Sequence, residues 1–278
     1  MVVTGSYNTV LALSNARTWT KSGPGTSFST TVKRYVDVFT DVIKVGKYYY
    51  LIGTSGVRIS NDAITWSLIE PRTQLIPQRI AYGNGTFVLV GRGGLIQSSP
   101  NGWSWVTRTS GVSDQLQGVT FGANGFVAVG MQGVILTSPD GTSWTKRVSG
   151  KLSKLNAVVA GKGMYVVAGD MGIILTSPDG VTWTDRYLSS GTNKGLFGAG
   201  FAAETFLVVG NDGTILTSPD SITWTQRTSG VTTNLTAVGR SKTSFTVVGH
   251  AGVVLTSNDG ISWTKLDTGV LDALHGVL

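Results

Sequence analysis

The segment ILTSPDGVTWTDR, residues 174–186, recurs in closely similar form along the whole chain. Its nearest copies are ILTSPDGTSWTKR (135–147), ILTSPDSITWTQR (215–227) and VLTSNDGISWTK (254–265). Weaker copies are IQSSPNGWSWVTR (96–108), RISNDAITW (58–66) and ALSNARTWT (12–20). The tryptophans that close the seven copies are Trp19, Trp66, Trp105, Trp144, Trp183, Trp224 and Trp263, spaced by 47, 39, 39, 39, 41 and 39 residues. Of the 8 tryptophans, Trp103 alone falls outside this series, so a repeat of about 39 residues organises the fold.

Each repeat divides into four short strands separated by turn residues. In one copy the strands are LNAVVA (155–160), MYVVAG (164–169), GIILTS (172–177) and VTWTDR (181–186). Four strands in about 40 residues is the size of one propeller blade. A Gly-x-x-Gly pattern joins the second strand to the third, and we expect both glycines to supply the positive φ of a tight two-residue hairpin.

The two ends of the chain complete each other. The C-terminal LHGVL, from Leu274, is a first strand with no blade after it, and the N-terminal segment 2–20 is a blade that lacks only its first strand. Joining them leaves no free sheet edge. The sequence therefore predicts a single domain over residues 1–278. Its fold is an all-β, seven-bladed β-propeller with four antiparallel strands per blade, closed by the C-terminal strand joining the N-terminal blade.

Two features of the repeat are interpreted as structural. The tryptophans recur around the whole ring, which favours packing between blades over ligand stacking. A short polar side chain occupies the turn before the fourth strand and can accept hydrogen bonds from nearby backbone N–H groups. Because catalytic groups must converge on one pocket, we interpret this set as turn staples: Asp62, Asn101, Asp140, Asp179, Asp220 and Asp259.

The first strand should lie nearest the axis, where side chains must be small. Two residues after its start stand Gly118, Ala157, Gly198, Ala237 and Gly276. Asp41 and Arg79 are the exceptions, in adjacent blades. We predict an axial ion pair between them, since burial requires a charge to be paired. A functional site on the axis is the alternative.

Composition narrows the chemistry. The chain has no Cys and two His, which argues against disulfides and zinc sites, and we expect neither a metal nor a cofactor. A net charge of +7 without a Lys/Arg run argues against a nucleic-acid partner. The sequence contains no stretch of 18 apolar residues, so no membrane span is predicted. No secretion signal is evident either, and we therefore expect a location in a virion or the cytoplasm.

The repeated segments resemble Asp-box (BNR) repeats, with pattern S-x-D-x-G-x-T-W, and the propellers of photosystem II assembly factor-like proteins. Here Asp and Gly are adjacent, as in SPDGTSW (138–144), so the turn is one residue shorter. The resemblance implies the propeller fold. Such repeats occur in sialidases, assembly factors, receptors and bacteriophage virion proteins, so it implies no single function.

The face that carries the connections between blades varies most among repeats, which is typical of a binding surface. We expect its two expanded loops, after Trp19 and Trp66, to hold a protein partner through Lys33, Arg34, Tyr35, Arg72 and Arg92. The expected function is a non-enzymatic structural or assembly propeller in a larger assembly, for example a bacteriophage virion component. The alternatives are a lectin-like or receptor-binding module that recognises glycans, and a sialidase-like glycoside hydrolase. The hydrolase lacks an evident catalytic set, because the two glutamates, Glu70 and Glu204, form no recognisable carboxylate pair.

Overall fold

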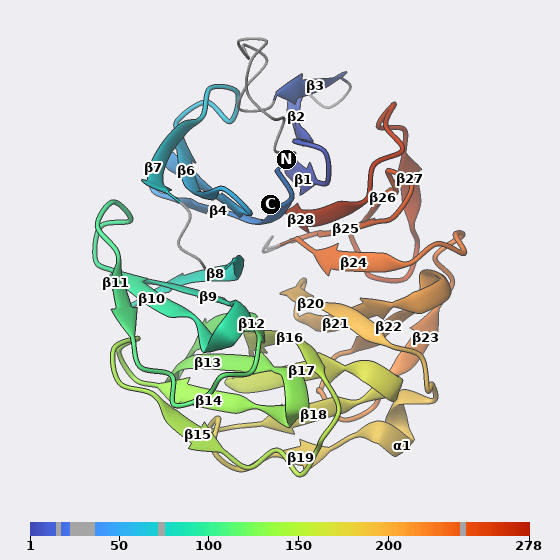
Figure 1. Cartoon of the computed structure of the whole chain (residues 1–278). Helices are drawn as coiled ribbons and strands as arrows, with labels where there is room; N and C mark the ends of the chain where they lie inside the picture. The colour runs from blue at the N-terminus through green and yellow to red at the C-terminus, as the bar shows by residue number, and fades with distance from the viewer. Residues whose placement is uncertain (15–17, 23–36, 72–75, 240–242) are drawn as a thin grey trace.

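The computed structural model describes residues 1–14, 18–22, 37–71, 76–239 and 243–278. These residues form seven four-stranded antiparallel sheets arranged as blades around a central axis (Figure 1). Blade 1 combines the two ends of the chain, and blades 2 to 7 follow in chain order. The expected all-β, seven-bladed propeller is confirmed.

The strands of each blade run from the axis outward. Blade 1 contains β28 (Leu274–Val277), β1 (Val2–Gly5), β2 (Val10–Ser14) and β3 (Thr18–Ser22). Blades 2 and 3 contain β4 (Phe39–Val45), β5 (Tyr48–Gly53), β6 (Gly56–Ser60) and β7 (Ser67–Pro71), then β8 (Pro77–Gly83), β9 (Thr86–Gly91), β10 (Ile96–Ser99) and β11 (Val106–Arg108). Blade 4 contains β12 (Leu116–Gly122), β13 (Gly125–Gly130), β14 (Ile135–Ser138) and β15 (Thr145–Arg147).

The remaining blades repeat this pattern. Blade 5 contains β16 (Leu155–Gly161), β17 (Met164–Gly169), β18 (Ile174–Ser177) and β19 (Thr184–Asp185). Blades 6 and 7 contain β20 (Leu196–Ala202), β21 (Thr205–Gly210), β22 (Ile215–Ser218) and β23 (Thr225–Arg227), then β24 (Leu235–Val238), β25 (Phe245–Gly249), β26 (Val254–Ser257) and β27 (Thr264–Leu266). The short helices are η1 (Arg92–Gly94), η2 (Met131–Gly133), η3 (Asp170–Gly172), η4 (Asn211–Gly213) and α1 (Tyr187–Ser190). No helix in the described ranges has the length and apolar character needed to cross a membrane.

The ring has two faces, which we name by their connections. The loop face carries the links between blades and between second and third strands, including η1 to η4. The turn face carries the links between first and second strands and between third and fourth strands. The seven strands nearest the axis are called the inner strands.

Closure of the ring joins the two termini. Strand β28 pairs antiparallel with β1, with Val277 opposite Val3 and Gly276 opposite Thr4. The N and C labels lie close together in Figure 1. Leu274 of β28 is fully buried between blades 7 and 1. The C-terminal strand thus completes blade 1, as the sequence predicted.

The hydrophobic core consists of seven clusters, one between each pair of neighbouring blades. Each cluster receives one repeat tryptophan. Trp66 and Trp224 are buried members, and the other five pack against their clusters. The prediction that these tryptophans pack between blades is confirmed, because a flat blade can bury its faces only against its neighbours.

In blades 2 to 7 the polar residue of the repeat lies in the turn between the third and fourth strands. In blade 4, Asp140 Oδ1 accepts hydrogen bonds from the N–H groups of Thr142 (2.8 Å) and Ser143 (3.3 Å). Ser138 Oγ donates to the same oxygen at 3.2 Å and accepts from Gly141 N–H at 2.8 Å. Asn101 makes the equivalent contacts in blade 3. Every bond spans at most three residues, so the turn is held by its own sequence.

The glycines between second and third strands act differently from expectation. Gly130, the first of its pair, is extended at φ −165, so positive φ is not the reason for glycine there. A Cβ at Gly130 would overlap the carbonyl oxygen of Gln115 at the start of the neighbouring inner strand. Gly133 does have positive φ (67), as does Gln132 (53). The prediction was therefore wrong for the first glycine, where close backbone approach excludes a side chain.

Deleting residues 271–278 removes β28 and leaves β1 and the cluster between blades 7 and 1 uncovered. We expect the melting temperature to fall by roughly 10 °C or more, because buried Leu274 and Val277 are lost with the strand pairing. Circular dichroism melts measure this. Leu271→Ser is the control, since Leu271 is 86% exposed and precedes β28. Equal melting of the deletion and the intact chain would contradict closure by β28.

Asp140→Ala removes the acceptor from the blade 4 turn. The hydroxyl and N–H of Thr142 hold the pKa of Asp140 at about 2, below its ordinary 3.8. A lowered pKa in the folded state means that the carboxylate stabilises the fold above about pH 4 and loses this effect between about pH 4 and 2. We expect the variant to melt about 2–4 °C lower at neutral pH, with the difference closing over that window.

Asp140→Asn is the matched control for this turn, because blade 3 already uses Asn101 at the same place. Its melting temperature at neutral pH should stay close to that of the unmodified chain. Its melting temperature should fall slightly less between pH 4 and 2, because only the other turn aspartates still titrate there. A loss at neutral pH as large as that of Asp140→Ala would contradict the capping role.

Candidate functional site

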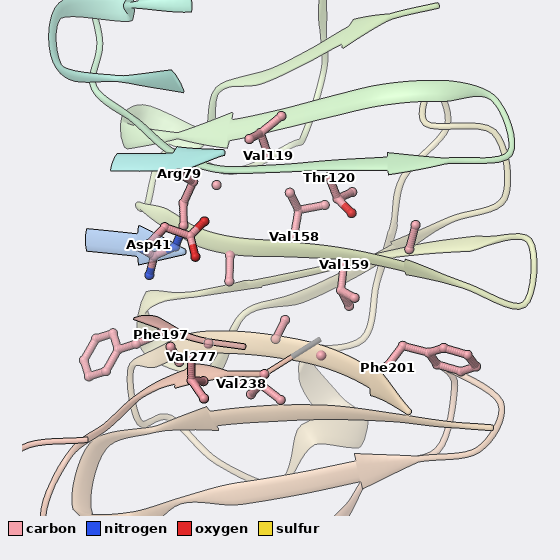
Figure 2. A pocket seen from close by; sticks show the side chains of 18 residues that line it. Asp41, Arg79, Val119, Thr120, Val158, Val159, Phe197, Phe201, Val238 and Val277 are labelled. Atoms are coloured by element: carbon pink, nitrogen blue, oxygen red, sulfur yellow. The ribbon is translucent and has the colours of Figure 1, made fainter. Parts of the chain in front are cut away.

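The inner strands line a central channel in which side chains have little room. A Cβ at Gly198 would lie 2.9 Å from the Cα of Ala237, and one at Gly276 would lie 2.9 Å from the Cα of Asp41. The position two after each inner-strand start is therefore in contact from blade to blade, which explains its glycines and alanines. Figure 2 shows the channel, about 280 Å³ in volume, with Asp41 and Arg79 together toward one end and Phe201 at the other.

Each inner strand carries a β-bulge just before this crowded level. In blade 4, Leu116 pairs with Gly130 and Gly118 with Val129, so Gln117 is the extra residue. The same shift occurs in every blade. The bulged residues are Thr40, Gln78, Gln117, Asn156, Phe197, Thr236 and His275. All seven line one pocket of about 350 Å³ on the loop face, which we call the channel mouth.

The bulged side chains tie neighbouring blades together. Thr236 Oγ1 donates to the carbonyl oxygen of Leu274 in the next blade at 2.5 Å. Asn156 Nδ2 donates to the carbonyl oxygen of Leu196 at 2.9 Å and to the carboxylate of Asp170 at 2.7 Å. These polar groups rim the mouth and are partly satisfied within the protein. A ligand that enters the mouth therefore meets groups held in place, which lowers the cost of ordering them.

Asp41 and Arg79 link blades 2 and 3 at the base of the mouth. The Asp41 carboxylate accepts a hydrogen bond from Ile80 N–H of blade 3 at 3.2 Å. The Arg79 guanidinium donates to the carbonyl oxygen of Thr40 of blade 2 at 2.7 Å. The two side chains lie next to each other in Figure 2. Each of these hydrogen bonds crosses the blade boundary and ends on backbone.

Positive charge gathers at the channel mouth. Arg79, Arg92 and Lys154 line it, and among its described lining residues none is a carboxylate. Arg92 and Lys154 form no ion pair with any described residue. Ion pairs elsewhere among the described residues include Arg58–Asp37, Lys151–Asp185, Lys162–Glu204 and Lys194–Asp212. Arg92 and Lys154 are thus without an ion-pair partner among the described residues, while the Asp170 carboxylate beside the mouth is bound to Asn156. The excess of positive charge favours an anionic ligand.

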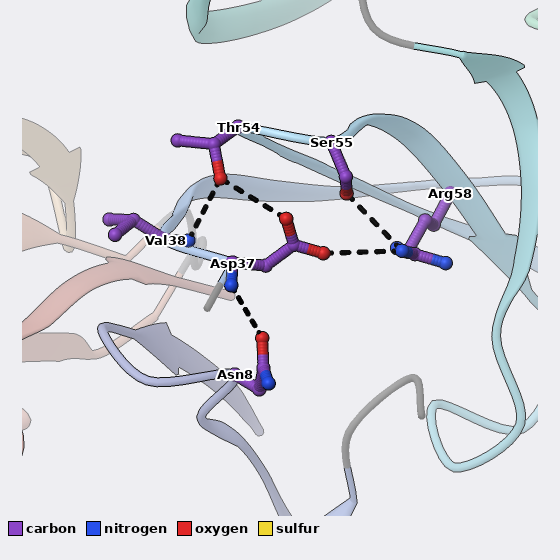
Figure 3. Close-up of polar contacts among 6 residues, drawn as sticks. All are labelled: Asn8, Asp37, Val38, Thr54, Ser55 and Arg58. Carbon is purple, nitrogen blue, oxygen red and sulfur yellow. Dashed lines mark hydrogen bonds and ion pairs between the residues drawn. The ribbon is translucent and has the colours of Figure 1, made fainter. Parts of the chain in front are cut away.

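A network at the edge of the mouth fixes blade 1 against blade 2 (Figure 3). The Asp37 carboxylate accepts hydrogen bonds from Thr54 Oγ1 at 3.1 Å and from Arg58 Nη2 at 3.2 Å. Its N–H donates to Asn8 Oδ1 at 2.7 Å. The end of the loop before β4 is therefore anchored to the loops after β1 and β5. Val38, the next residue, lines the mouth.

His275 is the one histidine among the seven bulged residues, and it lines the mouth. Ser6 Oγ lies 2.9 Å from its Nε2. Burial, then the charges of Arg79 and His250, lower the pKa of His275 to about 4. The ring is therefore neutral at pH 7 and adds hydrogen-bonding capacity without charge.

The residues proposed from the sequence fall in different places. Arg92 lies at the mouth, and Asp41 and Arg79 lie at its base. Lys33, Arg34, Tyr35 and Arg72 lie outside the described residues. The turn staples lie on the opposite face, where each holds its own hairpin. The Asp41–Arg79 site therefore adjoins the expected binding face.

The sequence reasoning did not identify Lys154 as part of one site with the bulged residues. A signal was present, because the residue after each inner-strand start is polar in six of the seven repeats, within otherwise apolar strands. Strand alternation alone would assign that residue to one sheet face. The bulge instead turns it toward the axis, and a bulge is not evident from a single repeat.

No protein-family model matches the chain, and no curated protein matches it. Among solved structures, it is similar to YCF48 from Cyanidioschyzon merolae, with 18% identity and a TM-score of 0.63 over 85% of this chain and 87% of that chain. YCF48 bound to D1 peptide gives 19% identity and a TM-score of 0.64, over 84% and 82%. A nidogen/laminin complex gives 13% identity and 0.57, over 99% and 96%. At these identities the similarity shows the propeller fold alone.

His275→Gln tests the environment of the mouth, and blades 3 and 4 already carry Gln at this position. Since the folded pKa of about 4 lies below the ordinary 6.5, the neutral ring contributes stability above pH 6.5 that is lost as pH falls toward 4. We expect the melting temperature of the unmodified chain to fall over this window and that of His275→Gln to fall less. His250→Gln, which removes the last and smallest of the three causes of this lowered pKa, should reduce the fall far less than His275→Gln does.

Proposed function

We propose that this protein is a non-enzymatic docking propeller that holds an anionic segment of a protein partner at the channel mouth. The observation that carries the proposal is the unpaired positive charge of Arg92 and Lys154 above Arg79, in a pocket whose described lining holds no carboxylate. Its volume of about 350 Å³ lies at the low end for small-ligand pockets, so it admits a few side chains of a partner.

The surroundings of the mouth support a macromolecular partner. The two expanded loops are residues 21–37 and 67–78. Val38, which follows the first loop, and Ile76, within the second, line the mouth. Lys33, Arg34, Tyr35 and Arg72 remain in the proposal as contacts on these segments. YCF48, which has a similar fold, has been solved with a peptide bound. A propeller of this shape is therefore compatible with peptide docking.

A finer proposal rests on composition. A chain with 13% charged residues and 38 glycines, built as one rigid β ring, suits a component of a larger assembly such as a bacteriophage particle. Native mass spectrometry of the complexes that form in the source cells tests this. Recovery of the chain only as a free monomer would contradict it.

The docking proposal is tested with Arg92→Ala combined with Lys154→Ala. The matched control is Lys146→Ala with Lys265→Ala, which removes the same charge from exposed positions on outer strands β15 and β27. Affinity for partners recovered by crosslinking, measured by biolayer interferometry, should weaken about tenfold or more for the mouth variant. The control should bind like the unmodified chain. Docking at the mouth would be contradicted if both variants lost affinity equally, or if neither variant lost affinity.

A further inference from the structure

The turn face carries aromatic residues where two neighbouring blades depart from the repeat. Trp103 occupies the tip of the turn between β10 and β11. The same tip in the other blades with a described turn holds Ile64, Thr142, Val181, Ile222 and Ile261. Tyr48 begins β5, and the same position in blades 3 to 7 holds Thr86, Gly125, Met164, Thr205 and Ser244. Trp105 already supplies the packing between blades 2 and 3, so core packing does not account for Trp103.

The two departures meet in space. The rings of Tyr48 and Trp103 lie 6.1 Å apart at 87°, edge to face across the blade boundary. Trp103 is 47% exposed, and Tyr82, which stacks on Phe87, is 41% exposed. Tyr50 lies beneath, against Gly102, where a Cβ would lie 2.5 Å from its ring. We call Tyr48, Tyr82 and Trp103 the aromatic platform.

Polar groups lie beside the platform. Lys47 Nζ lies 5.2 Å from the centre of the Tyr48 ring. Tyr48 and Tyr82 themselves each carry a phenol hydroxyl. Flat aromatic surface thus lies beside phenol and ammonium hydrogen-bonding groups.

The size of the platform selects the class of ligand. An aromatic side chain presents about 150–250 Å² in all, so two rings that are less than half exposed offer roughly 200 Å². A stable protein interface needs about 800 Å² from each partner. The exposed aromatic surface matches one or two sugar rings. The C–H face of a pyranose stacks on the negative face of an aromatic ring, while its hydroxyls reach phenols and ammonium groups at the rim.

We propose that the aromatic platform of blades 2 and 3 is a carbohydrate-binding site that stacks a pyranose ring on Trp103 and hydrogen-bonds it through Tyr48 and Lys47. This site is independent of docking at the channel mouth, because it lies on the opposite face. An experiment can therefore contradict the carbohydrate-site proposal without contradicting the docking proposal, and the reverse.

The test uses neutral di- and trisaccharides of glucose, galactose, mannose and N-acetylglucosamine with the full chain. Saturation-transfer difference NMR should show transfer to sugar C–H protons for at least one of them. Trp103→Ile should weaken that binding about tenfold or more. This variant places at the tip the residue that blades 6 and 7 carry, so its melting temperature should be unchanged. Ile261→Ala alters the corresponding tip of blade 7, which is similarly exposed, and should bind normally.

Tyr48→Thr introduces the residue that blades 3 and 6 carry at this position. It provides a second test of saccharide binding in case Trp103→Ile lowers the melting temperature. It should also weaken saccharide binding, while Arg92→Ala with Lys154→Ala leaves it intact. The proposal is overturned by absence of transfer from every saccharide at millimolar concentration. Saccharide binding that both platform variants retain overturns it as well, as does a Trp103-dependent response confined to an acidic peptide or a single-stranded oligonucleotide.

Discussion

The close approach of seven inner strands around one axis is the constraint on which the rest of the molecule depends. At the narrowest level the backbones nearly touch, so that a side chain at Gly198 would press on Ala237. A regular strand would place alternate side chains into this space. The bulge in each inner strand adds one residue just before this level, and the seven extra side chains line the channel mouth. The channel mouth is thus a consequence of fitting seven sheets into a ring.

In the same ring, the residues that stabilise the fold are different from the residues that vary among the blades. Packing between blades is carried by repeated elements, one tryptophan to each cluster, and the staples such as Asp140 are repeated with them. Since these elements are nearly identical around the ring, they cannot tell one partner from another. Residues that differ among blades, such as Arg92 and Lys154, are therefore the ones to which we assign recognition in the proposed docking.

Departures from the repeat gather on blades 2 and 3 at both faces. On the loop face Val38 and Ile76, which belong to or follow the two expanded loops, line the mouth together with Arg79 and Arg92. On the turn face Tyr48, Tyr82 and Trp103 form the aromatic platform. The two surfaces differ in chemistry, since the first is cationic and recessed and the second is aromatic and open. We propose different ligands for them, a charged peptide segment and a sugar, on opposite sides of one ring.

The sequence by itself determined the number of blades, their strand order and closure through Leu274, because each signal is local and repeats every 39 residues or so. It also determined the turn chemistry of Asp140, whose hydrogen bonds span three residues. The explanation of Gly130 drawn from the sequence was wrong. The carbonyl oxygen that excludes a side chain there belongs to Gln115, 15 residues earlier, at the start of the neighbouring strand.

Only the tertiary structure decided the mouth and the platform. Gln117, Asn156 and His275 come from blades that are distant in sequence, and they meet because the ring closes and each inner strand bulges at the same level. Trp103 and Tyr48 are 55 residues apart and become neighbours across a blade boundary. A pattern read along one repeat contains no information on contacts between repeats. Those contacts are set by the curvature of the ring, which no single repeat encodes.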